Sequence, residues 1–145
     1  MNTLSFEKIL EKPAVGDYIG AKIIINGESL QDKIRVIETP FAITVGLPES
    51  AGDYSHQNAD WLYRQLKGES HSDTYPDRIA FMTCSCTVDE CGGFWCKTKD
   101  TGDKVVWYGF RTGKRMDYDE MGEFRFNKEQ YNKALDDLRA FICNQ

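Results

Sequence analysis

Cysteine is the residue type whose spacing in this chain comes nearest to a chemical site. Four of the five cysteines follow the pattern C-x-C-x4-C-x4-C, at Cys84, Cys86, Cys91 and Cys96. Four thiolates satisfy the tetrahedral coordination of structural zinc, which usually takes its ligands as two tight pairs. Cys91 and Cys96 are too far apart for a standard C-x2-C pair, and Cys84 and Cys86 in one strand would point to the same face. The number of ligands therefore fits zinc, and the spacing does not.

Two other interpretations of the cysteine cluster remain open. Buried thiols pack as small hydrophobic side chains, here beside Phe94 and Trp95. A nucleophilic cysteine would instead need a base or a cationic environment that stabilises the thiolate. Asp89 and Glu90 lie between the cysteines, and their negative charge disfavours a thiolate. The sequence favours plain packing, with zinc stabilisation and a thiol-dependent enzyme as alternatives.

Other residues with catalytic chemistry are few. His56 and His71 both lie in polar stretches, where each is a candidate base or metal ligand but is more typical of a solvated loop. The chain contains no glycine-rich phosphate loop, H-E-x-x-H or G-x-S-x-G motif. An enzymatic role is therefore not favoured.

An acidic segment that carries an aromatic residue offers a second kind of site. Carboxylates steer a basic protein toward a surface, and an exposed ring anchors it there. A solvated loop before the last helix is the alternative. The predicted partner-binding residues are Asp117, Tyr118, Asp119, Glu120 and Glu123.

The composition limits the class of protein. The 145 residues are 41% hydrophobic and 28% charged, which is typical of one globular domain over residues 1–145. The net charge of -5 disfavours nucleic acid and suits a basic protein partner. We find no secretory signal, and no apolar run long enough to cross a bilayer. We therefore expect no membrane partner. An odd number of cysteines fits a reducing, cytoplasmic location.

The first half of the chain predicts short elements around clear turn residues. Asn26-Gly27 favours a type I′ hairpin turn, and Pro40 interrupts the apolar run that follows. Asn58 is a good helix N-cap. The expected elements are strands over 18–25, 33–37 and 41–45 and a helix over 58–66.

The second half predicts an antiparallel meander. The expected strands cover 79–86, 94–98 and 104–110. In the third strand, Val105, Trp107 and Gly109 alternate with Val106, Tyr108 and Phe110. Because both sets are largely apolar, we expect a central strand that is covered on each face.

The last helix has the strongest local pattern. Asn127 is the expected N-cap, Gln130 would complete a capping box, and Phe126 would pack on Tyr131 as a hydrophobic staple. Apolar residues then recur at helical spacing as far as Ile142. The predicted fold class is α+β, in which antiparallel β-hairpins and a meander form a sheet with the C-terminal helix packed on one face.

The second half also resembles an uncharacterised family of small bacterial proteins. The shared features are a C-x-C-x4-C turn over 84–91, a V-x-W-x-x-F strand over 105–110 and an F-x-F-x3-Q-Y-x2-A-L tail over 124–135. Thr87 replaces a glycine of the family pattern, and Cys96 is an additional cysteine, which weakens the case for a four-thiolate site. The resemblance supports the fold and implies no activity.

These observations lead to one functional hypothesis and two alternatives. We expect a non-enzymatic, cytosolic binding protein, of the bacterial inhibitor or immunity type, that acts on a basic protein partner. A zinc-stabilised structural domain and a thiol-dependent enzyme are the alternatives.

Overall fold

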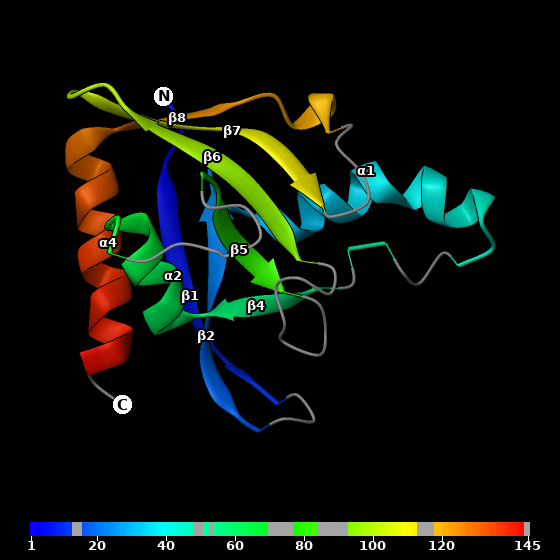
Figure 1. The fold of residues 1–145 in the computed structure, drawn as a ribbon, viewed down its shortest axis with the longest axis horizontal. Helices are drawn as coiled ribbons and strands as arrows, with labels where there is room; N and C mark the ends of the chain where they lie inside the picture. The colour runs from blue at the N-terminus through cyan, green and yellow to red at the C-terminus, as the bar shows by residue number, and fades with distance from the viewer. Residues whose placement is uncertain are drawn as a thin grey trace.

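An antiparallel sheet organises the fold (Figure 1). The computed structural model describes residues 1–12, 16–47, 51–52, 54–69, 77–83, 93–112 and 118–143. Within these ranges the strands are β1 (Leu4–Glu11), β2 (Tyr18–Ile25), β3 (Glu28–Ser29), β4 (Ser55–Asn58), β5 (Ile79–Thr83), β6 (Phe94–Asp100), β7 (Lys104–Thr112) and β8 (Phe124–Asn127). The helices are α1 (Leu30–Thr44), α2 (Ala59–Leu66), α4 (Lys128–Cys143) and the 3-10 turn η2 (Asp119–Met121). The strand order is β1-β2-β4-β5-β6-β7-β8, with β3 paired to β2.

The sheet curls until its first and last strands are linked. Asn2, just before β1, bridges to Phe126 of β8, and its backbone N–H donates to the Arg125 carbonyl at 2.8 Å. The Gln130 side chain also donates to the Leu4 carbonyl at 2.5 Å and accepts from the Leu4 N–H at 3.0 Å. The capping box predicted for Gln130 is therefore wrong, because its amide binds a distant strand.

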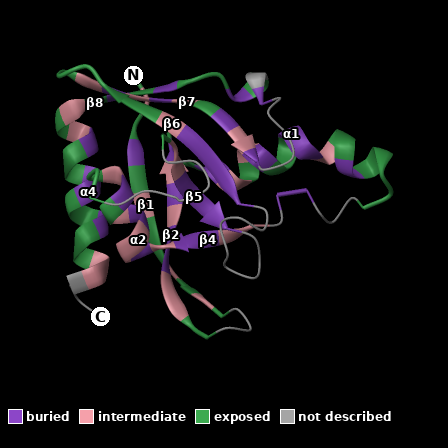
Figure 2. Cartoon of the chain, viewed as in Figure 1, coloured by how far each residue is buried: buried purple, intermediate pink, exposed green. Residues whose placement is uncertain are grey.

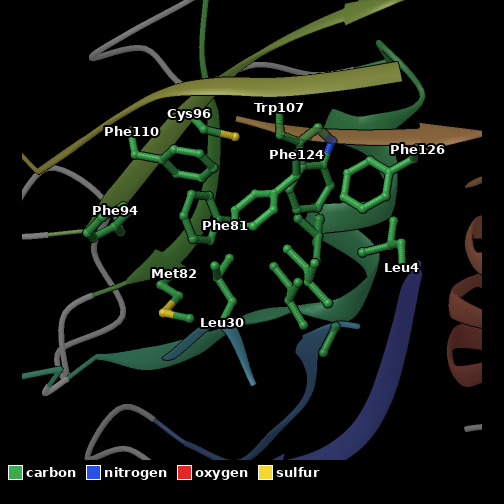
Figure 3. Packing of buried hydrophobic residues seen from close by; sticks show 14 of the residues in the cluster. Leu4, Leu30, Phe81, Met82, Phe94, Cys96, Trp107, Phe110, Phe124 and Phe126 are labelled. Carbon is green, nitrogen blue, oxygen red and sulfur yellow. The ribbon is translucent and has the colours of Figure 1, made fainter. Parts of the chain in front are cut away.

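An aromatic cluster fills the interior of the curled sheet (Figure 3). The Phe81 ring lies 5.2 Å from Phe94, 5.9 Å from Phe110 and 6.4 Å from Trp107, measured between ring centroids. Trp107 in turn meets Phe126 edge-on at 5.2 Å. Such offset and edge-to-face pairs add stability beyond the area that they bury. The meander thus contributes most of the rings that form the core.

The C-terminal helix packs on this sheet as predicted. Its buried stripe includes Ala134, Leu135 and Leu138, and α4 contacts β1 and α2. The rings of Phe126 and Tyr131 lie 5.7 Å apart, which confirms the hydrophobic staple. The predicted α+β class, an antiparallel sheet with this helix against it, is confirmed.

Two predicted N-caps are also confirmed. The Asn58 side chain accepts from the Trp61 N–H at 3.1 Å, at the start of α2. The Asn127 side chain accepts from the N–H groups of Glu129 and Gln130 at 3.0 and 3.2 Å.

Across the described ranges, none of the helices combines the length and the apolar character that crossing a bilayer requires.

The strand predicted over 33–37 is wrong, because these residues belong to α1. Asn26 and Gly27 do take the positive φ angles of the predicted turn, 56° and 79°, but β3 after it has only two residues. Leu30, Ile34 and Ile37 are buried at helical spacing, so the period near 3.6 outweighs the alternating pattern. The long partner of β2 is instead β1, paired along the whole strand.

The strand predicted over 41–45 is also wrong, because α1 continues through Pro40 as far as Thr44. The helix ends in a Schellman motif. In this motif, the Gly46 N–H donates to the Ile43 carbonyl at 3.0 Å and the Leu47 N–H to the Ala42 carbonyl at 2.8 Å. Gly46 takes a φ of 76°, which glycine adopts without strain. The helix end is thus encoded by Gly46 and not by the proline.

The meander strands are confirmed over the described residues, with 84–86 of the first predicted strand lying outside them. One face of β7, however, is not covered as predicted. Arg111 and Tyr108 of β7 pair with Trp95 and Lys97 of β6, so the chain bulges at Gly109, whose φ is 66°. The bulge reverses the alternation: Phe110 joins Val105 and Trp107 in the core. On the opposite face, Val106 and Tyr108 are only half-buried.

Candidate functional site

The cysteine cluster is described only at Cys96. The other predicted zinc ligands, Cys84, Cys86 and Cys91, lie outside the described residues. Cys96 is 1% exposed, and Figure 3 shows it among the core rings. Burial raises the pKa of its thiol, which opposes the thiolate that zinc binding or nucleophilic attack requires. Among the described residues, no group of His, Cys, Asp and Glu side chains is arranged to hold a metal ion.

His56 does not lie in a solvated loop. It belongs to β4 and is 6% exposed, and burial lowers the pKa of its imidazole. Its Nδ1 atom has no hydrogen-bond partner among the described residues. Its carbonyl accepts from the Tyr18 hydroxyl at 2.7 Å, and burial and nearby Glu11 raise the pKa of Tyr18 to about 12. Because its pKa is lowered, the His56 imidazole is neutral near pH 7. His71 lies outside the described residues.

The predicted acidic site is only partly at the surface. Glu120 and Glu123 are exposed, and Glu123 accepts from the Arg125 Nε atom at 2.7 Å. Tyr118 is 4% exposed, so its ring is not available as a surface anchor in this arrangement. Asp117 and the side chain of Asp119 lie outside the described residues. Partner binding by this segment remains a prediction.

Tyr118 instead joins the acidic segment to α1 through Glu38. Glu38 is 9% exposed, and its carboxylate accepts from the hydroxyls of Tyr118 at 2.6 Å and Tyr54 at 2.7 Å. It also accepts from the Gly52 N–H at 2.8 Å. Burial and the nearby carboxylate raise the pKa of Tyr54, so this phenol stays a donor. We call these four residues the Glu38 hub.

The Glu38 hub explains how a buried carboxylate is tolerated. A buried charge is costly unless it is hydrogen-bonded, and here three donors converge on it from two other segments. Glu38 has no local sequence signature, because its partners are 14 to 80 residues away along the chain. The hub holds Gly52, Tyr54 and the start of η2 against α1.

Beside the Glu38 hub, the apolar side of α1 extends beyond the part of the helix that packs on the rest of the protein. Ile34, Ile37 and Glu38 face inward, and Phe41 and Val45 continue the same side of the helix at spacings of three and four. Phe41 is nevertheless 49% exposed and Val45 69% exposed. Together with Tyr54 and Ala51, these residues line a hollow of about 290 Å³.

Exposed large apolar side chains of the described residues concentrate on α1 and the residues directly after it. The end of α1 projects from the sheet in Figure 1, and Figure 2 shows it as largely exposed. Five of the seven large hydrophobic side chains that are exposed in the described ranges lie in or directly after this helix: Val36, Phe41, Ile43, Val45 and Leu47. We call these five residues the projecting apolar surface. Phe41 and Val45 lie on the side of α1 that lines the hollow, whereas Val36 and Ile43 lie on the opposite side of the helix. A concentration of exposed apolar side chains on one element marks interaction sites.

Comparisons with protein-family models, with curated proteins and with solved structures give no match for this chain. The resemblance to a family of small bacterial proteins therefore stays a prediction.

Proposed function

We propose that this chain is a non-enzymatic binding protein that docks on a basic protein partner through the projecting apolar surface. One observation carries the proposal. The side of α1 that packs on the rest of the protein stays apolar beyond that contact, and Val45 on this side is 69% exposed. An α-helix that is apolar beyond its contact with the body gains stability when a second surface covers it. A partner's apolar side chain would occupy the hollow between Val45 and Tyr54.

Charge supports a basic partner. The chain carries a net charge of -5, and the exposed Glu120 lies on η2, which contacts α1. The hydrogen bond from the Tyr118 hydroxyl to Glu38 joins one residue of the predicted acidic segment to α1, which supports a charged rim beside the projecting apolar surface. An apolar centre with a charged rim is the usual anatomy of a protein interface, in which rim charges mainly raise the association rate. An inhibitor or immunity-type role against a basic protein fits this arrangement.

The alternatives receive less support. The buried Cys96 thiol, with its raised pKa, favours neither zinc ligation nor thiol catalysis. A chelator that left the melting temperature unchanged would remove the zinc alternative, since a structural zinc site contributes on the order of 10 kcal/mol.

Docking is tested with Val45→Asp and the matched control Leu10→Asp. Leu10 is also an exposed aliphatic side chain, at 52%, but lies on β1. We expect wild type and Leu10→Asp to retain the same basic protein from the source cells, and Val45→Asp to lose it. If Val45→Asp retained that protein as well as the control does, the proposed surface would be wrong. Circular dichroism would confirm that each variant is folded.

The charged rim is tested with the purified partner. Glu120→Lys should weaken binding mainly through a slower association rate, and the difference should shrink as salt is added. Titration calorimetry and stopped-flow mixing at two salt concentrations would measure this. An unchanged association rate would exclude the acidic segment from the interface.

A further inference from the structure

The outer face of β6, β7 and β8 carries a group of cations. Lys99 of β6 and Arg125 of β8 both lie opposite Val106 of β7, and directly opposed residues share one face of a sheet. Lys97 lies opposite Tyr108 in the same way, and its ammonium group pairs with Asp77 at 3.7 Å. The inner face holds the core rings, so these side chains line the other side of the sheet.

This face is hollowed into a groove of about 560 Å³. Val106 and Tyr108 contribute apolar surface to its lining. Lys99, Lys104 and Arg125 contribute positive charge, and Glu123 contributes one negative charge. The Arg125 guanidinium is paired with Glu123. Within the described part of the chain, the ammonium groups of Lys99 and Lys104 have no ion-pair partner. The groove is therefore locally positive, although the chain as a whole is negative.

We propose that this groove binds single-stranded nucleic acid. Lysine ammonium groups attract phosphates, and an aromatic ring on a sheet face is a platform on which a base stacks. The groove combines the two, with the Tyr108 ring on the central strand of the three and lysines beside it. An acidic peptide would use the lysines alone and would not need the ring.

The net charge does not oppose this proposal. The expectation against nucleic acid used the total charge of -5, whereas phosphate binding depends on cations within about one Debye length, roughly 8–10 Å. The groove is also separate from the projecting apolar surface: Figure 1 shows the β6–β7 turn and the free end of α1 at opposite sides of the molecule. The two surfaces can therefore be tested independently.

The test is fluorescence anisotropy with a short labelled oligothymidylate and a short labelled oligouridylate at low salt. We expect saturable binding of at least one of them by the wild-type chain. Lys104→Glu should weaken it about tenfold, and the slope of log affinity against log salt should become shallower by about 0.7 for each phosphate that is no longer neutralised. Tyr108→Ser should weaken binding roughly tenfold by removing the stacking ring, whereas Tyr108→Phe should preserve it.

Lys8→Glu is the matched control. Lys8 is exposed on β1, and its substitution changes the net charge by the same amount as Lys104→Glu. The proposal is overturned if the wild-type chain shows no saturable binding, or if Lys8→Glu weakens binding as much as Lys104→Glu. It is also overturned if a polyglutamate peptide competes as well as unlabelled oligonucleotide, since the groove would then select charge alone. Val45→Asp should leave this binding unchanged, which separates the result from that for the protein partner.

Discussion

The aromatic interior around Phe81 and the hub around Glu38 both join segments that are distant in sequence. In the interior, rings from β5, β6 and β7 pack at centroid distances of 5.2 to 6.4 Å without needing one particular hydrogen bond. In the hub, three donors depend on a single carboxylate. Packing energy is spread over many atoms, whereas the hydrogen bonds of the hub all disappear together when the acceptor is removed. Substitutions can therefore distinguish the two regions.

The largest effect is expected in the aromatic interior. Phe81→Ala removes a ring that is 1% exposed and leaves a cavity, so it should lower the free energy of unfolding by about 3–5 kcal/mol. Urea denaturation would measure the loss. Phe81→Leu keeps most of the volume and should cost less. Equal losses for the two variants would mean that the ring volume is not what holds the interior.

The next effect is expected in the hub. Glu38→Ala leaves the Gly52 N–H and two tyrosine hydroxyls without their acceptor, and should cost about 3 kcal/mol. Hydrogen exchange at the Gly52 amide should accelerate more than exchange in β7. Glu120→Ala removes an exposed carboxylate nearby and should change stability by less than about 0.5 kcal/mol. If Glu38→Ala lowered the free energy of unfolding no more than Glu120→Ala, the hydrogen bonds of the hub would not stabilise the fold.

A smaller effect is expected for one hydroxyl of the hub. Tyr118→Phe keeps the ring that packs on Phe94 at 4.7 Å but removes a hydrogen bond to a charged acceptor, so it should cost about 1.5 kcal/mol. Tyr63→Phe is the control, because the Tyr63 hydroxyl has no hydrogen-bond partner among the described residues. Thermal unfolding would measure both. A loss as small as that of the control would show that water replaces the Tyr118 hydrogen bond.

The smallest effect concerns His56, which is buried without the partners that Glu38 has. Its folded-state pKa is lowered from 6.5, mainly by burial, and Lys22 acts in the same direction while Glu11 and Glu7 oppose it. Below pH 6.5 the unfolded chain binds a proton that the folded chain does not bind. Stability should therefore fall as the pH drops below 6.5, by at most about 1.4 kcal/mol per pH unit.

His56→Gln should flatten this part of the stability curve. Urea midpoints at several pH values would measure the slope. An unaltered slope in His56→Gln would assign the pH dependence to other groups.

Features formed by residues close together in the chain could be predicted from the sequence, and features formed by distant residues could not. The caps at Asn58 and Asn127 and the Asn26-Gly27 turn were predicted because each is formed by residues within a few positions of one another. The helix over 30–44 was missed, since β-branched residues in it also suit a strand and the core that selects the helix lies outside the segment. Of the predicted site residues, Tyr118 was placed at the surface by its acidic neighbours, whereas Glu38 draws it inside.

The amino-acid sequence by itself determined the meander, the amphipathic C-terminal helix and the acidic charge, because composition and local periodicity encode them directly. Only the tertiary structure decided which apolar side chains of α1 remain exposed, and that Lys99, Lys104 and Arg125 share one groove. The physical reason is that exposure and local potential depend on which strands and helices become neighbours. That information is held in pairings such as Val106 with Arg125 and Glu38 with Tyr118, between residues remote in the chain.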